Sequence, residues 1–279
     1  MEHLLKLYSF ESVHGSPDEE AIADYIESLL KDWQVPYTRS DNNLYNLSQP
    51  DMPILSAHLD QVKTNGKAEH FVMTPDKHII GYNKYWQRTS LGGDDKNGVW
   101  IILKMLEAGH IVNFIISEGE ERGCIGIHAL ESEKVLDKII ELDTYCMVLD
   151  RKGDTDILKS GSGTTFCSTL AQSLCNFLGN HKWEVGSGSL SDTCTICDYC
   201  ESVNMSVAYF NPHTATEYTD WSSLQDICND VKEVIESFVH FPTPPEIYKP
   251  KSTYYSTSKF NKKGDQNEKE KWWRDYYNY

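Results

Sequence analysis

The stretch LGGDDKNGVWIILKMLEAGHIVNFIISEGEERG, residues 91–123, joins a glycine-rich acidic turn, a helix, a strand and a second acidic turn. Residues 96–108 predict a helix that Gly109 closes, because glycine readily adopts the left-handed conformation found just after helix ends. The apolar run 111–116 that follows is typical of a strand buried on both faces. A helix followed directly by a fully buried strand indicates an α/β fold.

Strands and helices continue to alternate on both sides of this stretch. Ser16, Pro17 and Glu19 predict a helix start, with Ser16 as the cap, Pro17 in the first turn and Glu19 completing a capping box. The alternation predicts an α/β three-layer sandwich with a mostly parallel central sheet and helices on both faces. Outside residues 91–123, the predicted strands are 35–38, 43–47, 53–57, 145–149 and 203–209, and the further predicted helices are 165–178, 192–200 and 222–239.

The charge and length of the chain exclude several classes of protein. Its 279 residues carry 42 acidic and 26 basic side chains, and the net charge of −16 argues against a nucleic-acid partner. No apolar run reaches the roughly 18 residues that a membrane helix needs, and residues 1–10 show no secretory signal. We therefore expect a folded, cytoplasmic protein without a membrane partner.

The composition changes near the C-terminus. From Lys249 onward there are eight basic and four acidic residues, few aliphatic residues and eight aromatic ones. We expect one folded domain at 1–243 and, at 244–279, an aromatic, basic tail that is flexible or docked on a surface. Aromatic and Arg side chains dominate many interfaces, so the tail is also a candidate for binding a protein partner.

Three of the eight cysteines, Cys194, Cys197 and Cys200, are spaced three apart in SLSDTCTICDYC, residues 189–200. The segment predicts a helix with the cysteines on one face. Core packing is the favoured interpretation, because buried free cysteine is common. Thiolates at this spacing also suit zinc or an iron–sulfur cluster, so a metal or redox role stays open.

Acidic and histidine side chains gather directly after the predicted strands, where the ligands of α/β sheets bind. His58 and Asp60 follow the strand 53–57 and point the same way in extended chain, so Asp60 can orient the imidazole. Asp94 and Asp95 lie in the glycine-rich turn, where two adjacent carboxylates normally require a cation. Taken alone, the pair around His58 is also typical of a surface histidine, and Asp94 of a helix cap.

Glu120 and Glu121 follow the buried strand 111–116, and successive side chains point apart, so one can bind metal while the other acts as general base. If Asp94 bridges two metals, each has three protein ligands and an open position for water, as in a catalytic site. Zinc suits such a mixed nitrogen and oxygen set, and manganese or cobalt is acceptable. The candidate ligands are His58, Asp94, Glu121, Asp150 and His213.

Five motifs, in this order, resemble those of the co-catalytic di-zinc exopeptidases of peptidase clan MH, which include zinc aminopeptidases, peptidase T and related deacylases: HLD (58–60), GGDDKNG (92–98), EGEERG (118–123), VLD (148–150) and NPHT (211–214). The resemblance covers residues 1–240 and implies that 1–243 is a di-metal peptidase catalytic domain. It implies that His58 and Asp150 bind one metal, that Glu121 and His213 bind the other, and that Asp94 bridges them. It also makes Glu120 the general base, assigns Asp60 to orienting His58, and suggests a cis peptide between Asp94 and Asp95.

The spacing of these motifs leaves no room for the lid or dimerisation domain of many family members. The insertion 61–90 is the candidate pocket wall in its place, through Tyr82, Tyr85, Trp86 and Arg88, or else a surface loop. Tyr82 is also, with Tyr209 and Tyr218, a candidate for stabilising the oxyanion of the reaction. A homo-oligomer stays open.

The expected function is hydrolysis of amide bonds with two divalent cations, and an aminopeptidase is the first choice. In that case Asp95 and Glu118 are candidates for holding the α-ammonium group of a peptide. The alternative is an N-acyl amino acid deacylase, a dipeptidase or a carboxypeptidase, with the substrate carboxylate held by Arg88, Arg122 or Arg151. A catalytically silent metal-binding interaction protein is less expected, because binding alone needs no general base.

Overall fold

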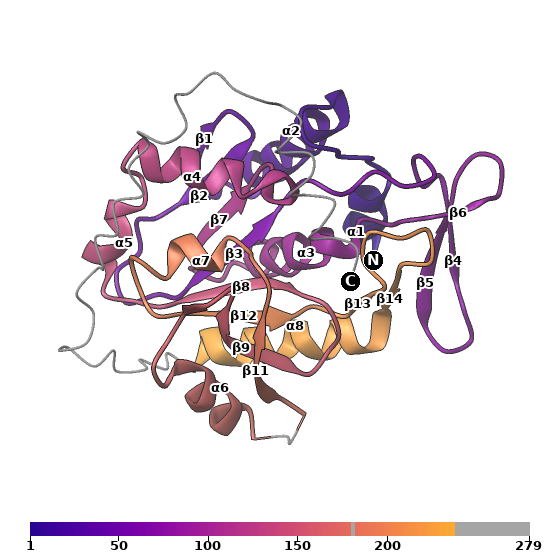
Figure 1. Ribbon diagram of the computed structural model, residues 1–279. Coiled ribbons are helices and arrows are strands. Elements are labelled where there is room, and N and C mark those ends of the chain that lie inside the picture. Colours follow the sequence, from indigo (N-terminus) through magenta and orange to yellow (C-terminus); the bar gives the residue numbers. More distant parts are fainter. Residues whose placement is uncertain (180–181, 238–279) are drawn as a thin grey trace, which may run out of the picture. The chain divides into compact units, whose positions relative to one another are not determined.

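The computed structural model describes residues 1–179 and 182–237, and these contain two β-sheets (Figure 1). The larger sheet has the strand order β1-β2-β7-β3-β8-β12-β9-β10, and β11 also pairs with β9. The tail predicted at 244–279, and with it the C-terminal boundary at 243, lies outside the described residues. The strands of this sheet are β1 (Thr38–Ser40), β2 (Asn43–Asn46), β3 (Ile54–His58), β7 (Asn113–Ser117), β8 (Cys146–Arg151), β9 (Asp156–Gly161), β10 (Thr164–Thr165), β11 (Glu184–Gly188) and β12 (Ser202–Ser206).

The centre of this sheet is parallel. Strands β7, β3, β8 and β12 pair in parallel, whereas β1 with β2, β2 with β7, β12 with β9 and β9 with β10 pair in antiparallel fashion. Parallel neighbours need a crossover connection, and the chain supplies helices for this purpose. The predicted α/β fold with a mostly parallel central sheet is confirmed.

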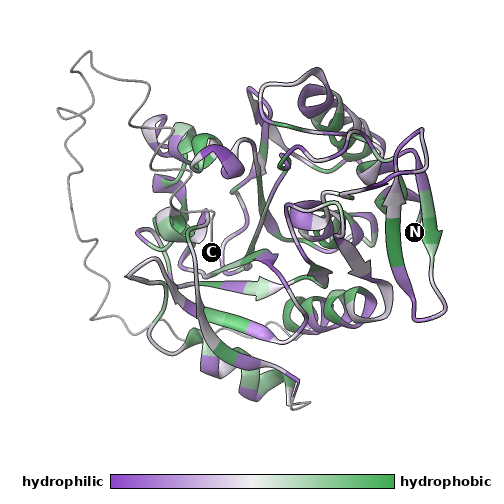
Figure 2. Ribbon diagram, turned by 45° about the vertical axis from the view of Figure 1, so that its right-hand side comes forward, coloured by the Kyte–Doolittle hydropathy of each residue, from purple (hydrophilic) through white to green (hydrophobic). Residues whose placement is uncertain are grey.

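Helices cover both faces of the sheet, as predicted, and the strand residues alternate between two apolar cores. In β3, Leu55 and Ala57 belong to one core and Ile54 to the other; in β7, Phe114 and Ile115 divide in the same way. Figure 2 shows hydrophobic and hydrophilic residues alternating along the covering helices. The first core contains α1 (Glu2–Tyr8), α2 (Pro17–Asp32), α3 (Gly93–Glu107), α6 (Leu170–Leu178) and α8 (Trp221–Glu236), and the second contains α4 (Ile125–Ser132), α5 (Asp137–Leu142) and α7 (Thr193–Ile196).

A second, smaller sheet combines three strands of the insertion 61–90, predicted as a pocket wall or a surface loop, with two strands from residues 209–220. Its order is β13-β14-β5-β4, with β6 paired to β5. The predicted strand 203–209 divides between the two sheets, because the chain turns at Ala208, whose φ is +61°. The strands are β4 (His70–Met73), β5 (His78–Tyr82), β6 (Arg88–Thr89), β13 (Tyr209–Phe210) and β14 (Tyr218–Asp220).

Several predicted boundaries are wrong. The strand expected at 35–38 lies at Thr38–Ser40, and the helix expected at 165–178 starts only at Leu170, after the short β10. The helix expected at 192–200 covers four residues, Thr193–Ile196. The capping box at α2 is incomplete: Ser16 accepts from the N–H of Glu19 at 3.3 Å, but the Glu19 carboxylate accepts from Gly15 instead. Within the described residues, none of the helices is long and apolar enough to cross a membrane.

Candidate metal centre

The candidate ligands meet at the carboxyl ends of the central strands. His58 is the last residue of β3, Asp150 lies near the end of β8, and Glu121 lies in the 3-10 turn η1 (Glu120–Arg122) that follows β7. Because β7, β3 and β8 are parallel neighbours, their carboxyl ends lie at one edge of the sheet. Residues distant in the sequence are therefore neighbours in space.

Asp94 reaches this edge from the start of α3. The backbone of Asp94 and Asp95 is not helical, and the peptide between them is cis, as the resemblance suggested. One turn later, Gly98 lies so close to β8 that an added Cβ would be 2.0 Å from the carbonyl oxygen of Leu149. The missing side chain therefore lets α3 pack against the backbone of β8, which brings Asp94 near the end of that strand.

The side chains form two groups that share Asp94. In the first, Nε2 of His58 lies 3.3 Å from Oδ1 of Asp94 and 3.5 Å from Oδ1 of Asp150. In the second, Nε2 of His213 lies 3.1 Å from Oδ2 of Asp94 and 2.6 Å from Oε1 of Glu121. Within each group the possible ligand atoms all lie within 4.8 Å of one another. Each oxygen of Asp94 thus faces a different group.

Asp60 connects the first histidine to the turn that carries the two glutamates. Its Oδ1 lies 3.3 Å from Nδ1 of His58 and accepts the N–H of Glu120 at 2.9 Å, while Oδ2 accepts the N–H of Glu121 at 3.1 Å. Nδ1 of His58 also lies 3.1 Å from the carbonyl oxygen of Asp60. With Nδ1–H donating to Asp60, the lone pair of Nε2 points toward Asp94 and Asp150.

Burial and mutual repulsion perturb the titration of the cluster. Burial raises the pKa of Glu120 well above its ordinary value and raises the pKa of Asp150 to about 7. Burial also disfavours the charge of His213, but its hydrogen bonds with Asp94 and Glu121 prevail and raise its pKa to about 11. Among the residues that the structure describes, the ion pairs of these carboxylates are with two imidazoles, and bound cations stabilise such a concentration of negative charge.

The donor set fits divalent cations. His58 is 2% exposed, and its buried Nε2 has no hydrogen-bond partner in the part of the chain that the structure describes. A buried polar nitrogen without a partner is costly, and coordination by a metal would satisfy it. Imidazole and carboxylate ligands suit zinc and the neighbouring transition metals. His58, Asp94 and Asp150 would hold one ion, and Asp94, Glu121 and His213 the other.

Glu120 lies beside both groups. Its Oε2 is 4.0 Å from Nε2 of His58, and the backbone of the turn is held by Asp60. Tyr209, a candidate for the oxyanion, places its hydroxyl 3.4 Å from Oδ1 of Asp150. All three candidates belong to the second sheet; of the other two, Tyr218 stacks on Phe210, and Tyr82 lies against Trp86.

The two residues considered for a substrate ammonium group are placed elsewhere. Asp95 is fully buried and accepts from the N–H groups of His58 and Gly98 at 3.2 and 3.1 Å, so it supports the site from behind. Glu118 is 8% exposed, and its side chain faces Asn43 at 3.4 Å. Both expectations are corrected, because each carboxylate is already engaged by the protein.

Two of the three arginines considered for a substrate carboxylate are also engaged. Arg88 donates to the carbonyl oxygens of Thr216 and Glu217, and Arg151 donates to Asp156 at 3.1 Å. Arg122 is exposed at the end of η1.

Sequence reasoning missed Glu217, which is fully buried and accepts four hydrogen bonds from the turn that leads to Asp94. It also missed Asp192, whose carboxylate accepts from Ser117 at 2.5 Å beside the first group. Glu217 follows His213 by four residues, but nothing in such a spacing distinguishes a buried carboxylate from a solvated one.

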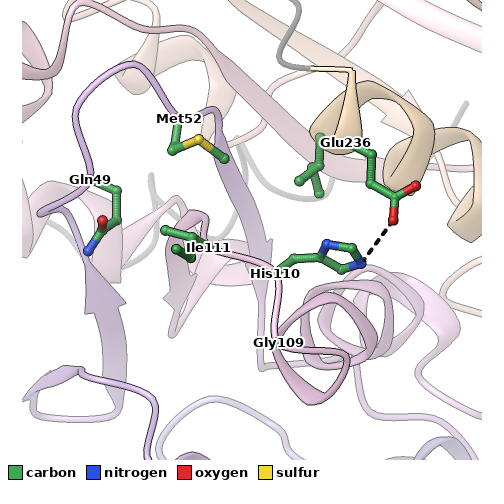
Figure 3. A pocket seen from close by; sticks show the side chains of 7 residues that line it. Gln49, Met52, Gly109, His110, Ile111 and Glu236 are labelled. Atoms are coloured by element: carbon green, nitrogen blue, oxygen red, sulfur yellow. Dashed lines mark ion pairs between the residues drawn. The ribbon is translucent and has the colours of Figure 1, made fainter.

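The pocket in Figure 3 lies at the opposite edge of the sheet. Gln49 and Met52 precede β3, and Gly109, His110 and Ile111 precede β7, so the pocket opens at the amino ends of these strands. The pocket therefore has no part in the candidate metal centre.

The cysteine run does not form a single face. Cys197 packs with Leu158 and Phe166, and Cys200 packs in the core beneath α4 and α5. Burial raises the pKa of both thiols to about 12, which disfavours the thiolate that a metal requires. In the described part of the chain, the groups of side chains able to hold a metal include none of these cysteines. Core packing, the favoured interpretation, agrees with this placement.

Comparisons with known proteins connect the fold to peptidases. No protein-family model matches the chain, and no curated protein sequence does. Among solved structures, a tripeptidase from Staphylococcus aureus matches with a TM-score of 0.68 and 17% identity, over 85% of this chain and 97% of that one. Aminopeptidase PepT from Bacillus cereus matches with 0.69 and 16%, over 85% and 97%. The TET1 peptidase of Pyrococcus horikoshii, described as assembling into a tetrahedron or a large octahedral shell, matches with 0.58 and 13%, over 84% and 98%. The chain has the fold of these peptidases.

Proposed function

We propose that this chain is a metal-dependent aminopeptidase that hydrolyses the first amide bond of a peptide. The observation that carries the proposal is the position of Asp94 between two groups of ligands, one completed by His58 and Asp150 and the other by Glu121 and His213. Two divalent cations held there would lower the pKa of a water molecule and polarise the substrate carbonyl. The fold shared with tripeptidases and aminopeptidases supports the same conclusion.

The chain's own residues supply the proton transfers. Glu120 takes a proton from the attacking water and later gives it to the leaving amine. Burial raises the pKa of its carboxyl, and a carboxylate whose pKa is raised toward neutral is better suited to accept a proton. Asp60 holds the backbone of Glu120 and the ring of His58, so the base and the first ligand keep a fixed relation.

The charge of the site favours a substrate with a free amine. Five carboxylates converge there, and their charge exceeds the four positive charges of two divalent cations. A substrate carboxylate would need a separate cation. Arg88 and Arg151 already bind acceptors within the protein, which leaves the exposed Arg122 of the three candidate arginines. The ammonium group of a substrate would instead be attracted by the excess negative charge of the site. The five carboxylates belong to Asp60, Asp94, Glu120, Glu121 and Asp150.

The test is hydrolysis of a peptide pool that contains free, N-acetylated and C-amidated versions of each sequence. The full chain is incubated with zinc, manganese or cobalt and, as the control, with a chelator, and products are read by mass spectrometry. We expect stepwise loss of N-terminal residues from peptides with a free amine, whether or not the C-terminus is amidated. Loss of acetyl groups or of C-terminal residues would contradict the aminopeptidase and favour the deacylase or carboxypeptidase.

A further inference from the structure

Glu217 is a fully buried carboxylate that the proposed reaction does not use. Its Oε2 accepts hydrogen bonds from the hydroxyl of Ser90 at 2.5 Å and from the N–H groups of Leu91 and Gly92 at 2.7 and 2.8 Å. Its Oε1 accepts from the N–H of Asp94 at 3.3 Å. All four partners are donors, so both oxygens of Glu217 act as acceptors.

The position of Glu217 joins two segments that carry ligands of the same group. It ends the loop 211–217, which contains His213, and it binds the turn 90–94, which ends in Asp94. Arg88 fixes the loop from the other side, because its guanidinium donates to the carbonyl oxygens of Thr216 and Glu217 at 3.1 and 3.3 Å. His213 and Asp94, whose Nε2 and Oδ2 atoms are 3.1 Å apart, therefore lie on two segments that Glu217 connects.

The other group has a different support. His58 and Asp150 lie on β3 and β8, which are neighbours in the sheet, so backbone hydrogen bonds set their relative position. No comparable ladder connects the loop 211–217 to the turn 90–94 in the described part of the chain. Because Asp94 belongs to both groups, loss of Glu217 is expected to disturb the Glu121–His213 group more than the His58–Asp150 group.

We propose that Glu217 is a positioning residue that sets the geometry of the Glu121–His213 group, and with it the affinity of that group for its metal. The inference rests on the proposed function, because it concerns the second of the two metals. Glutamine cannot replace the carboxylate. In either orientation its NH2 group faces N–H donors, at Asp94 or at Leu91 and Gly92, and repels them.

The test is titration of cobalt or zinc into the full, metal-free chain, with the stoichiometry read by native mass spectrometry and the affinities by calorimetry. In Glu217→Gln we expect one metal to bind about 10- to 100-fold more weakly, as for other partners that orient metal ligands, and the other metal, which shares Asp94, to be weakened by a smaller factor. In this variant, the absorption spectrum of cobalt bound at the weakened site should also differ from that of the wild type. Ser90→Ala removes one of the four donors and should weaken the same site by a smaller factor.

The matched control is Glu201→Gln. Glu201 is another buried glutamate, 5% exposed, that accepts from the N–H and hydroxyl of Ser168, between α6 and β12. Its replacement is expected to lower the melting temperature without weakening the binding of one metal more than that of the other. Ser90→Ala keeps the carboxylate and serves as the test if Glu217→Gln does not fold.

The outcomes separate the two proposals. Wild-type protein that binds fewer than two metals contradicts the proposed function and this inference with it. If the wild type binds two metals and Glu217→Gln binds both with unchanged affinity, only the role of Glu217 is overturned. Equal weakening of both metals in Glu217→Gln and Ser90→Ala would show a general structural role and overturn it as well.

Discussion

The two groups of candidate metal ligands differ in how the fold supports them. His58 and Asp150 lie on adjacent strands, and their side chains are 2% and 8% exposed. Glu121 and His213 lie in a 3-10 turn and in a loop, and the side chain of His213 is 29% exposed. The sheet positions the first group through its backbone, whereas the second depends on side chains that tie loops together. We therefore expect the first group to be the more rigid and to bind its metal more tightly.

The largest effect is expected from Glu120→Gln, which removes the base and leaves both metal groups intact. Hydrolysis should fall by about 10²- to 10⁴-fold, the usual contribution of a general base, while the protein still binds two metals. Steady-state kinetics and metal analysis on the same preparation measure the two quantities.

Glu118→Gln is the control for this substitution, because it changes a glutamate two residues away whose side chain faces Asn43. It should retain most of the activity. Near-wild-type turnover in Glu120→Gln would remove Glu120 from the proposed role.

The variants His58→Ala and His213→Ala each remove the histidine of one group, so they test the difference between the two groups most directly. Each variant should lower the affinity for the metal of its own group by at least about 100-fold. Removing a residue that only orients a ligand costs up to about 100-fold, and removing the ligand itself should cost at least as much. His58→Ala should also lower the melting temperature more in metal-free protein, because it leaves Asp94 and Asp150 buried without an imidazole between them. Titration and thermal unfolding measure both effects. If the two variants lost the same melting temperature, the group on strands and the group in a turn and a loop would not differ in their structural support.

Asp60→Asn should have a smaller effect that reaches both groups. Asp60 contacts His58 through Oδ1 and accepts from the N–H of Glu121 through Oδ2, and an amide cannot accept at both positions. We expect a loss of about 10- to 100-fold in activity or metal affinity. Metal titration would contradict this role if both affinities stayed unchanged.

The smallest effect is the pH dependence of the metal-free protein. The folded-state pKa values of Asp150, about 7, and His213, about 11, both lie above their ordinary values of 3.8 and 6.5. The protonated forms therefore favour folding. Their contribution is complete below the ordinary values and is lost as the pH rises through the folded-state values. In the presence of a chelator, the melting temperature should fall by several °C between about pH 5 and pH 9, given roughly 2–4 °C per kcal/mol for a chain of this size.

Adding zinc at the upper pH should restore the melting temperature, because the metal replaces the protons as the positive charge of the site. In His213→Ala the part of the decrease above about pH 7 should disappear. A melting temperature that rises with pH in the chelated wild type would show that other groups dominate the titration.

The apolar patterns predicted the α/β fold, while short segments and loops escaped prediction. The run 111–116 is apolar except for Asn113, which is typical of a strand covered on both sides, and β7 (Asn113–Ser117) overlaps it. By contrast, the insertion 61–90 forms β4, β5 and β6, whose partly exposed residues give only a weak pattern. The helix at Cys194 is shorter than predicted, and beyond its end Cys197 and Cys200 pack in separate clusters.

The sequence by itself indicated which acidic and histidine side chains are candidates for the chemistry and predicted the α/β fold, because residue type and hydrophobic spacing are local properties. His58, Asp94, Glu121, Asp150 and His213 were chosen on that basis, and their metal-binding roles stay predictions. Only the tertiary structure decided which carboxylates face the site. Asp95 turns behind it, Glu118 faces Asn43 and Glu217 holds a distant turn, since hydrogen bonds between segments far apart in the chain decide these orientations.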